Sequence, residues 1–485
     1  MSDRWSPRGK PGRSGRAVRA ALALVAACLL AAANAPAARA QEPTPEQRLE
    51  RLERQVEELR AALEAAAGRE VEPADVTELR RQIEAITREL EQMRLGRDVV
   101  VAADTSILGL GPAASKVYKV DQGVSIGGYG EALYENFVAE RDDGTDAGLT
   151  DQFDFLRAIV YFGYKFDDRF VFNSEIEFEH SSTDQAGSVS VEFAYLDWLF
   201  GGAGSTLGAR AGILLLPMGF LNELHEPPVF LGTERPVTEQ AIIPSTWREN
   251  GIGLFGDAGD FAWRAYLVNG LDGVGGGTSD ADGFSASGLR GGRQKGSKAV
   301  AESFAVTGRA DWTGILGLTL GASAYYGDSG QGVEDPLDPA GEIGASTFIG
   351  EAHAQYKARG FDLRGLVALA TVDDVESLNA ARGLSGDSSI GERLVGGYVQ
   401  AGYDVLRGVD TRVQLLPYVR WERLNTQDDV PDGFAANPAN DRTIVSVGAQ
   451  VLPIPNIVLK ADYQFHSNEA DTAVDQFNVA LGYLF

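Results

Sequence analysis

Apolar and polar residues alternate one by one along most of this 485-residue chain, and this two-residue period constrains its fold more than any other feature. In the last segment, every second residue from Phe477 to Phe485 is apolar or aromatic, while Gln476 and Asn478 belong to the opposite set. Successive side chains of a strand point to opposite faces, so such a segment has one apolar and one polar face. Segments of about ten residues with this pattern are typical of transmembrane β-strands.

The pattern repeats between residues 124 and 485, and the connections alternate in length. Odd-numbered connections such as 138–152 and 271–301 are long, whereas even-numbered ones such as 167–168 are short. Long loops on one side and short turns on the other are typical of bacterial outer-membrane barrels, and open strand edges cannot face lipid. We therefore predict an all-β transmembrane barrel of sixteen antiparallel strands with both ends of the barrel on the periplasmic side. The predicted strands are 124–137, 153–166, 169–181, 188–200, 207–219, 248–256, 260–270, 302–312, 316–327, 346–358, 360–372, 393–404, 411–424, 442–452, 455–467 and 474–485.

The first 40 residues predict an export signal. Basic residues from Arg4 to Arg19 precede the apolar stretch 20–33, and small residues flank a cleavage position after Ala40. This combination is typical of a secretory signal peptide over residues 1–40. In the alternative interpretation, the residues before Cys28 form a lipoprotein box, which would place a lipid on that cysteine.

Residues 41–97 predict a short α-helical coiled coil in the periplasm. From Leu49 to Met93, with one break, apolar residues recur alternately three and four positions apart, and charged residues occupy the other faces. Isolated helices are marginal in water, so the pattern favours self-association. An amphipathic helix folded on a globular core is the alternative. Residues 98–123 are then a linker, and 124–485 are the outer-membrane barrel.

Charge and composition exclude several classes of function. The chain has 69 acidic and 43 basic residues, a formal net charge of −26, which argues against a nucleic-acid partner because phosphate backbones require clustered basic residues. A single Cys excludes a disulfide framework, and the four His residues lack metal-binding spacing. Ser181 and Ser182 follow His180 at a predicted strand end, and local adjacency of this kind is common by chance. We expect no catalytic residues, no enzyme activity, no cofactor and no metal.

Local motifs in the barrel region resemble one family of porins. The strand Arg210–Gly219, which ends in Pro-Met-Gly, and the segments Glu234–Pro236 and Ile243–Gly251 are similar to the phosphate-selective porin family, porins O and P. The resemblance covers most of residues 120–485. It implies a trimeric outer-membrane channel of sixteen strands, with phosphate as the preferred anion in some members. It also implies that the third outer loop, 220–247, folds inward and narrows the lumen.

Strand parity assigns charged residues of both signs to the lumen. Opposed charges across a wet pore create a transverse field, and the interleaved acids argue against a purely basic path for phosphate. We expect a modest ion preference, with the wall arginines facing glutamates of the third loop. The predicted pore-lining residues are Arg157, Arg210, Arg264, Arg309, Arg364, Arg412, Arg420, Lys460, Glu175, Glu177 and Glu351, and the predicted constriction residues are Glu223, Glu226, Glu234 and Arg235.

These features predict an outer-membrane porin of a Gram-negative-type envelope, through which small hydrophilic solutes and ions diffuse passively. The expected partners are outer-membrane lipid, further copies of the chain in a homotrimer, small ions and solutes that include phosphate, and the barrel-insertion machinery, which would recognise the terminal Phe485. The alternative is a structural protein that tethers the envelope through its coiled coil, with the barrel as an anchor.

Overall fold

The structure is a computed structural model that describes residues 110–120, 122–181, 187–201 and 206–485. The chain divides into two compact units, Met1–Arg97 and Asp98–Phe485. The predicted signal peptide, the coiled coil and the first part of the linker lie outside the described residues, so these predictions stay open.

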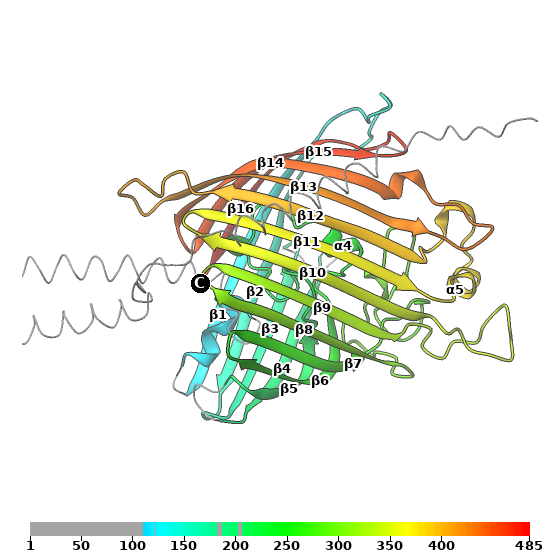
Figure 1. Ribbon diagram of the computed structural model, residues 1–485, viewed down its shortest axis with the longest axis horizontal. Helices are drawn as coiled ribbons and strands as arrows, with labels where there is room; N and C mark the ends of the chain where they lie inside the picture. The colour runs from blue at the N-terminus through cyan, green and yellow to red at the C-terminus, as the bar shows by residue number, and fades with distance from the viewer. Residues whose placement is uncertain (1–109, 121, 182–186, 202–205) are drawn as a thin grey trace, which may run out of the picture. The chain divides into compact units, whose positions relative to one another are not determined.

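Sixteen antiparallel strands in the described residues form one closed barrel, in which β1 pairs with both β2 and β16 (Figure 1). The predicted barrel is confirmed. The strands are β1 (Gly123–Phe137), β2 (Gln152–Lys165), β3 (Phe170–Glu179), β4 (Val189–Leu199), β5 (Gly208–Leu215), β6 (Arg248–Ala258), β7 (Phe261–Asn269), β8 (Phe304–Ile315), β9 (Leu318–Asp328), β10 (Ser346–Ala358), β11 (Phe361–Val372), β12 (Arg393–Tyr403), β13 (Gln414–Asp429), β14 (Asp441–Ile454), β15 (Ile457–Asn468) and β16 (Gln476–Leu484).

One strand is clearly shorter than its sequence pattern predicts. β5 ends at Leu215 rather than at residue 219, because Pro217 has no N–H to donate to a neighbouring strand and Gly219 adopts a positive φ of 66°. The chain therefore leaves the wall part of the way along this strand. The apolar run that follows, which reads as a continuing strand, instead begins the third loop.

Short helices occupy the connections. The helix α5 begins after Asp374 and ends at Arg382, before Gly383, and it lies in a connection that was predicted without any helix. Within the described residues, no helix is long and apolar enough to cross a membrane. The helices are η1 (Ala114–Tyr118), η2 (Pro227–Val229), α4 (Thr238–Ala241), η3 (Arg290–Gly292), α5 (Val375–Arg382), η4 (Gly386–Ser388) and η5 (Pro438–Asn440).

The two faces of the barrel wall differ in polarity, as the two-residue period requires. Apolar side chains on the outer face are exposed, which is the arrangement expected of a surface that contacts lipid. Examples of the outer set are Leu196, Leu254, Leu267, Val306, Val367, Val419, Val447, Leu459 and Leu481. The inner face carries charged and amide side chains that are buried, among them Glu175, Asp197, Arg264, Asp311, Glu351, Arg364, Arg420, Asp462 and Asn478.

The third loop, residues 216–247, lies inside the barrel, and nearly all of its residues are buried. On one side Phe220 packs edge-on against His353 of β10, with ring centroids 4.6 Å apart. On the other side Leu231 joins a cluster with Leu416 of β13 and Val458 of β15. Leu416 and Val458 lie near one end of the barrel. The connections between strands at this end, such as 455–456, are short, and we call it the short-turn end. The third loop therefore crosses the lumen toward that end.

Candidate functional site

Basic side chains of the inner wall hold the third loop by its backbone. Each donates to a carbonyl oxygen of the loop, and the four come from four different strands, β8, β11, β13 and β15. A carbonyl that accepts from a cation makes a stronger hydrogen bond than a neutral pair does. The contacts are Arg309 to Gly219, Arg364 Nη2 to Val229 (2.5 Å), Lys460 Nζ to Phe230 (3.0 Å) and Arg420 Nη1 to Glu234 (3.1 Å).

Acidic side chains of the wall bind the same loop by accepting hydrogen bonds. Asp462 of β15 accepts from the backbone N–H of Thr233 at 2.7 Å and from its hydroxyl. Glu422 of β13 accepts from the N–H of Thr238 at 2.5 Å. The loop is thus fixed by both signs of charge, and each of these buried carboxylates has a partner, as burial requires.

Other wall charges are neutralised in pairs. Arg210 binds Asp197 with two contacts of 2.8 and 3.0 Å, and its guanidinium lies 3.9 Å from the ring centre of Tyr195. Arg264 contacts Glu223 of the third loop at 3.1 Å. Glu351 contacts His353 at 2.9 Å. The wall arginines are therefore engaged with fixed partners, and they do not form an unpaired basic ladder.

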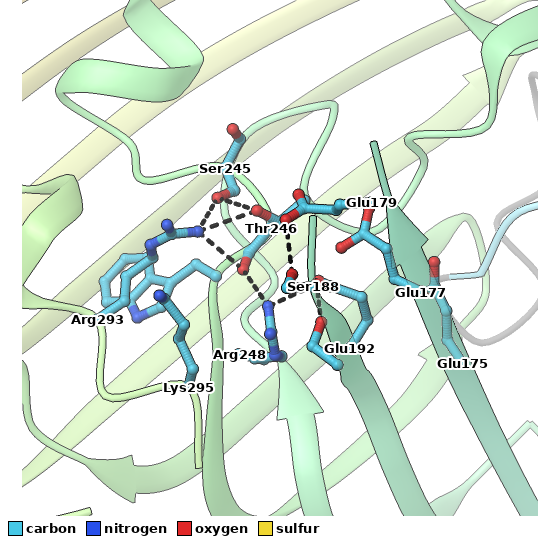
Figure 2. Close-up of polar contacts among 12 residues, drawn as sticks. Glu175, Glu177, Glu179, Ser188, Glu192, Ser245, Thr246, Arg248, Arg293 and Lys295 are labelled. Carbon is cyan, nitrogen blue, oxygen red and sulfur yellow. Dashed lines mark hydrogen bonds and ion pairs between the residues drawn. The ribbon is translucent and has the colours of Figure 1, made fainter. Parts of the chain in front are cut away.

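Opposed charges meet where the end of the third loop faces β3 and β4 (Figure 2). Glu175 and Glu177 of β3 and Glu192 of β4 supply the acidic side. Arg248, at the start of β6, contacts Glu192 at 2.6 Å, and Arg157 of β2 contacts Glu177 at 3.6 Å. We call this region the charged constriction, because it lies between the loop and the wall.

The fourth loop, residues 270–303, adds basic side chains to the charged constriction. Arg293 donates to the carbonyl oxygens of Ser245 (2.6 Å) and Thr246 (3.1 Å), and Arg290 donates to the same Ser245 oxygen at 2.9 Å (Figure 2 shows Arg293 beside both residues). Burial lowers the pKa of Arg290, and the neighbouring Arg293 lowers it further. The two arginines thus concentrate positive charge on the loop side.

Arg235 of the third loop belongs to the same positive group. Its side chain is buried, and its Nη2 has no hydrogen-bond partner among the described residues. Burial lowers the pKa of Arg235, and the nearby Arg157 lowers it further, while Glu177 opposes the shift. This Nη2 nitrogen lies opposite carboxylates and forms part of a polar lining. Water or a passing solute can supply the missing hydrogen bond there.

The structure places most of the predicted pore-lining residues on the inner face, but one prediction is wrong. Arg412 lies in the exposed turn between β12 and β13, because β13 begins only at Gln414. The predicted acidic loop patch is also dispersed. Glu223 is held by Arg264, Glu226 accepts from the N–H of Ala113 (2.9 Å), and Glu234 binds Gln476. At the charged constriction the acids come from the wall, and much of the positive charge comes from the loops.

Sequence reasoning missed Arg248, Arg290 and Arg293. Arg290 and Arg293 stand in a glycine-rich connection, and their positive charge within an acidic chain is the signal that could have been used. It also missed η1, because residues 98–123 read as a linker. No group of three or more His, Cys, Asp or Glu side chains in the described part of the chain could hold a metal ion.

Comparisons with known proteins give one clear relationship by sequence. No protein-family model matches the chain. Solved barrels that resemble it in structure include OmpF of Salmonella typhi in complex with daunomycin, at 12% identity over 75% of this chain and 98% of that one, with a TM-score of 0.48. They also include a loop-deletion variant of OmpT of Vibrio cholerae, at 12% identity over 76% of this chain and 100% of that one, with a TM-score of 0.46. An uncharacterized protein of Aquifex aeolicus is 38% identical over 386 residues, which cover 78% of this chain and 83% of the relative. The chain therefore belongs to the same family as this Aquifex protein.

Proposed function

We propose that the protein is an outer-membrane diffusion channel for small hydrophilic solutes and ions. The observation that carries this proposal is the closed sixteen-stranded wall with an apolar exposed outer face and a charged inner face. A surface of this kind is stable in lipid, and closure satisfies every strand edge. A barrel of this size encloses space for a polar path as well as for inward loops.

The charged constriction supports a general channel with a modest ion preference. Arg235, Arg290 and Arg293 face Glu177 and Glu192 across it, and opposed charges steer solutes without holding them tightly. Strict phosphate selectivity would need a continuous row of available cations. Arg364, Arg420 and Lys460 of the wall instead donate to backbone carbonyls of the third loop.

Single-channel recording in planar lipid bilayers tests the proposal. The purified full-length protein should produce discrete current steps in potassium chloride, and a salt gradient should give a small reversal potential. Micromolar phosphate should leave the chloride current unchanged. Failure of the folded protein to produce any current under all conditions would contradict the channel function.

A tethering role is the second candidate, because the third loop is buried inside the barrel and an anchor needs no open path. Deletion of residues 41–97 separates the two functions. If the chain is only an anchor, the deletion should weaken the cell envelope, as measured by detergent sensitivity, and solute uptake should be unaffected by either the deletion or the loss of the whole protein.

A further inference from the structure

The segment that precedes β1 lies against the inner wall. Leu110, Ala113, Ala114 and Val117 are all buried, and η1 packs on β1, β2 and β3. Val117 joins a cluster near the short-turn end of the barrel, where β3 begins and β4 ends. The chain thus places residues 110–118 against the inside of the wall before β1 begins at Gly123.

Polar contacts hold this segment between the wall and the third loop. Asn173 Nδ2 of β3 donates to the carbonyl oxygen of Ala114 at 2.9 Å, and the Tyr118 hydroxyl donates to Asp197 of β4 at 2.7 Å. From the other side, Glu226 Oε1 of the third loop accepts from the N–H groups of Ala113 (2.9 Å) and Ala114 (3.2 Å). The segment therefore bridges the two structures that border the lumen.

The wall beneath the segment is unusually apolar for an inner face. Tyr161 stacks on Phe193, which in turn stacks on Tyr195, and these rings belong to the same buried cluster as Leu110 and Ala113. Inner positions of a wet barrel are normally polar. An aromatic surface at these positions is explained by a protein segment that packs on it rather than by water.

The wall also leaves room for the segment at a glycine. A Cβ built on Gly163 of β2 would lie 2.7 Å from Val117 Cβ, closer than real side chains approach. Absence of a side chain at this position lets η1 sit directly on the strand. The shape of the wall, its aromatic surface and its polar groups together form a seat for residues 110–119.

We infer that residues 110–119 are a plug that closes the solute path at the short-turn end, and that the path opens when the plug leaves its seat. The inference rests on the proposed channel function. The plug is attached in a way that permits release, because most of it is a short 3-10 helix and it belongs to none of the sixteen strands of the wall. The second oxygen of Glu226, Oε2, has no hydrogen-bond partner among the described residues, so this buried link is incompletely satisfied.

A reversible disulfide between the plug and its seat tests the inference. In a chain with Cys28→Ser, the pair Val117→Cys and Gly163→Cys places two thiols in contact, since the 2.7 Å separation of the Cβ positions needs only a small shift to reach the ~3.8 Å of a disulfide. The oxidised protein should show about tenfold fewer openings in bilayer recordings, and a reductant should restore them. A matched pair, Ala322→Cys with Ala352→Cys, links β9 to β10 away from the plug and should leave the current unchanged on oxidation.

A second variant tests release in the opposite direction. Val117→Asp places a charge in the dry cluster around Val171 and should raise the open probability of the folded barrel. Equal currents from the oxidised and reduced plug pair, with complete crosslinking shown by mass spectrometry, would overturn the plug while the channel function stands. Absence of current from every variant, Val117→Asp included, would overturn the channel function and the plug with it.

Discussion

Asp462 of β15 holds the third loop in place through hydrogen bonds. Its carboxylate accepts from the N–H and hydroxyl of Thr233 and, at 2.7 Å, from the hydroxyl of Tyr418. Asp462→Ala leaves these donors buried without a partner, and we expect it to lower the free energy of unfolding by about 2–4 kcal/mol. Urea unfolding followed by the mobility shift of folded barrels on cold gels measures this loss. Asp410→Ala, in an exposed turn, is the control and should change stability by less than about 0.5 kcal/mol.

Glu226 should make the seating of the plug depend on pH. The residue lies in the third loop, outside the strands, and burial raises its pKa from 4.5 to about 8; Glu175 adds to the shift, while Lys116 and the two N–H groups of the plug oppose it. His225 and Tyr161 are the other titratable groups nearby. A carboxyl that binds its proton more tightly in the seated state favours seating at low pH, and this preference is lost as the pH rises toward about 8.

The expected outcome is a higher open probability at pH 8 than at pH 5 in bilayer recordings. Glu226→Gln removes the titrating proton but keeps an oxygen that can accept from Ala113 and Ala114. This variant should therefore show a flat response over the same range. A wild-type response that is flat, or that runs in the opposite direction, would show that Glu226 does not control the plug.

Among the elements, the seam between the first and last strands closes the ring. Gly128 and Phe485 exchange two backbone hydrogen bonds of 3.0 and 2.9 Å, and a Cβ on Gly128 would lie 2.2 Å from the carbonyl oxygen of Ile159. Gly128→Ala should therefore reduce the folded fraction in the membrane, measured by the gel shift of unheated samples. Gly344→Ala is the control because no atom lies within 4 Å of the added group. A folded fraction equal to that of the wild type would show that the seam tolerates a side chain at this position.

At the scale of the whole molecule, we expect a trimer. The motivation is the heptad pattern from Leu49 to Met93, which is outside the described residues, together with the marginal stability of isolated helices. Light scattering in detergent should give three copies per particle, and Leu59→Asp with Leu63→Asp should weaken the association without unfolding the barrel. A monomeric wild-type protein would contradict this prediction.

Sequence alone was sufficient for the wall because the two-residue period, the turn positions and the closure of edges are local or general constraints. It failed where long-range contacts decide. Arg412 was assigned to the lumen because alternate residues were counted from the predicted start of its strand. The strand β13 begins only at Gln414, so Arg412 lies outside it. The partners of Arg364 and Lys460 are carbonyls of a loop more than a hundred residues away in sequence, and no local pattern encodes those pairs. The plug was missed for the same reason, since its seat is formed by β1 to β4 only after they assemble.

The position of the plug has a consequence for the order of assembly. Its seat uses Tyr161, Asn173 and Asp197, and all three belong to strands that are synthesised early, whereas the ring closes only when β16 meets β1. The segment can therefore dock on an open, curved sheet, with the third loop laid over it, before the final strand arrives. A barrel built in this order is closed to solutes from the moment its wall is complete, so the membrane never contains an unfilled cylinder during biogenesis.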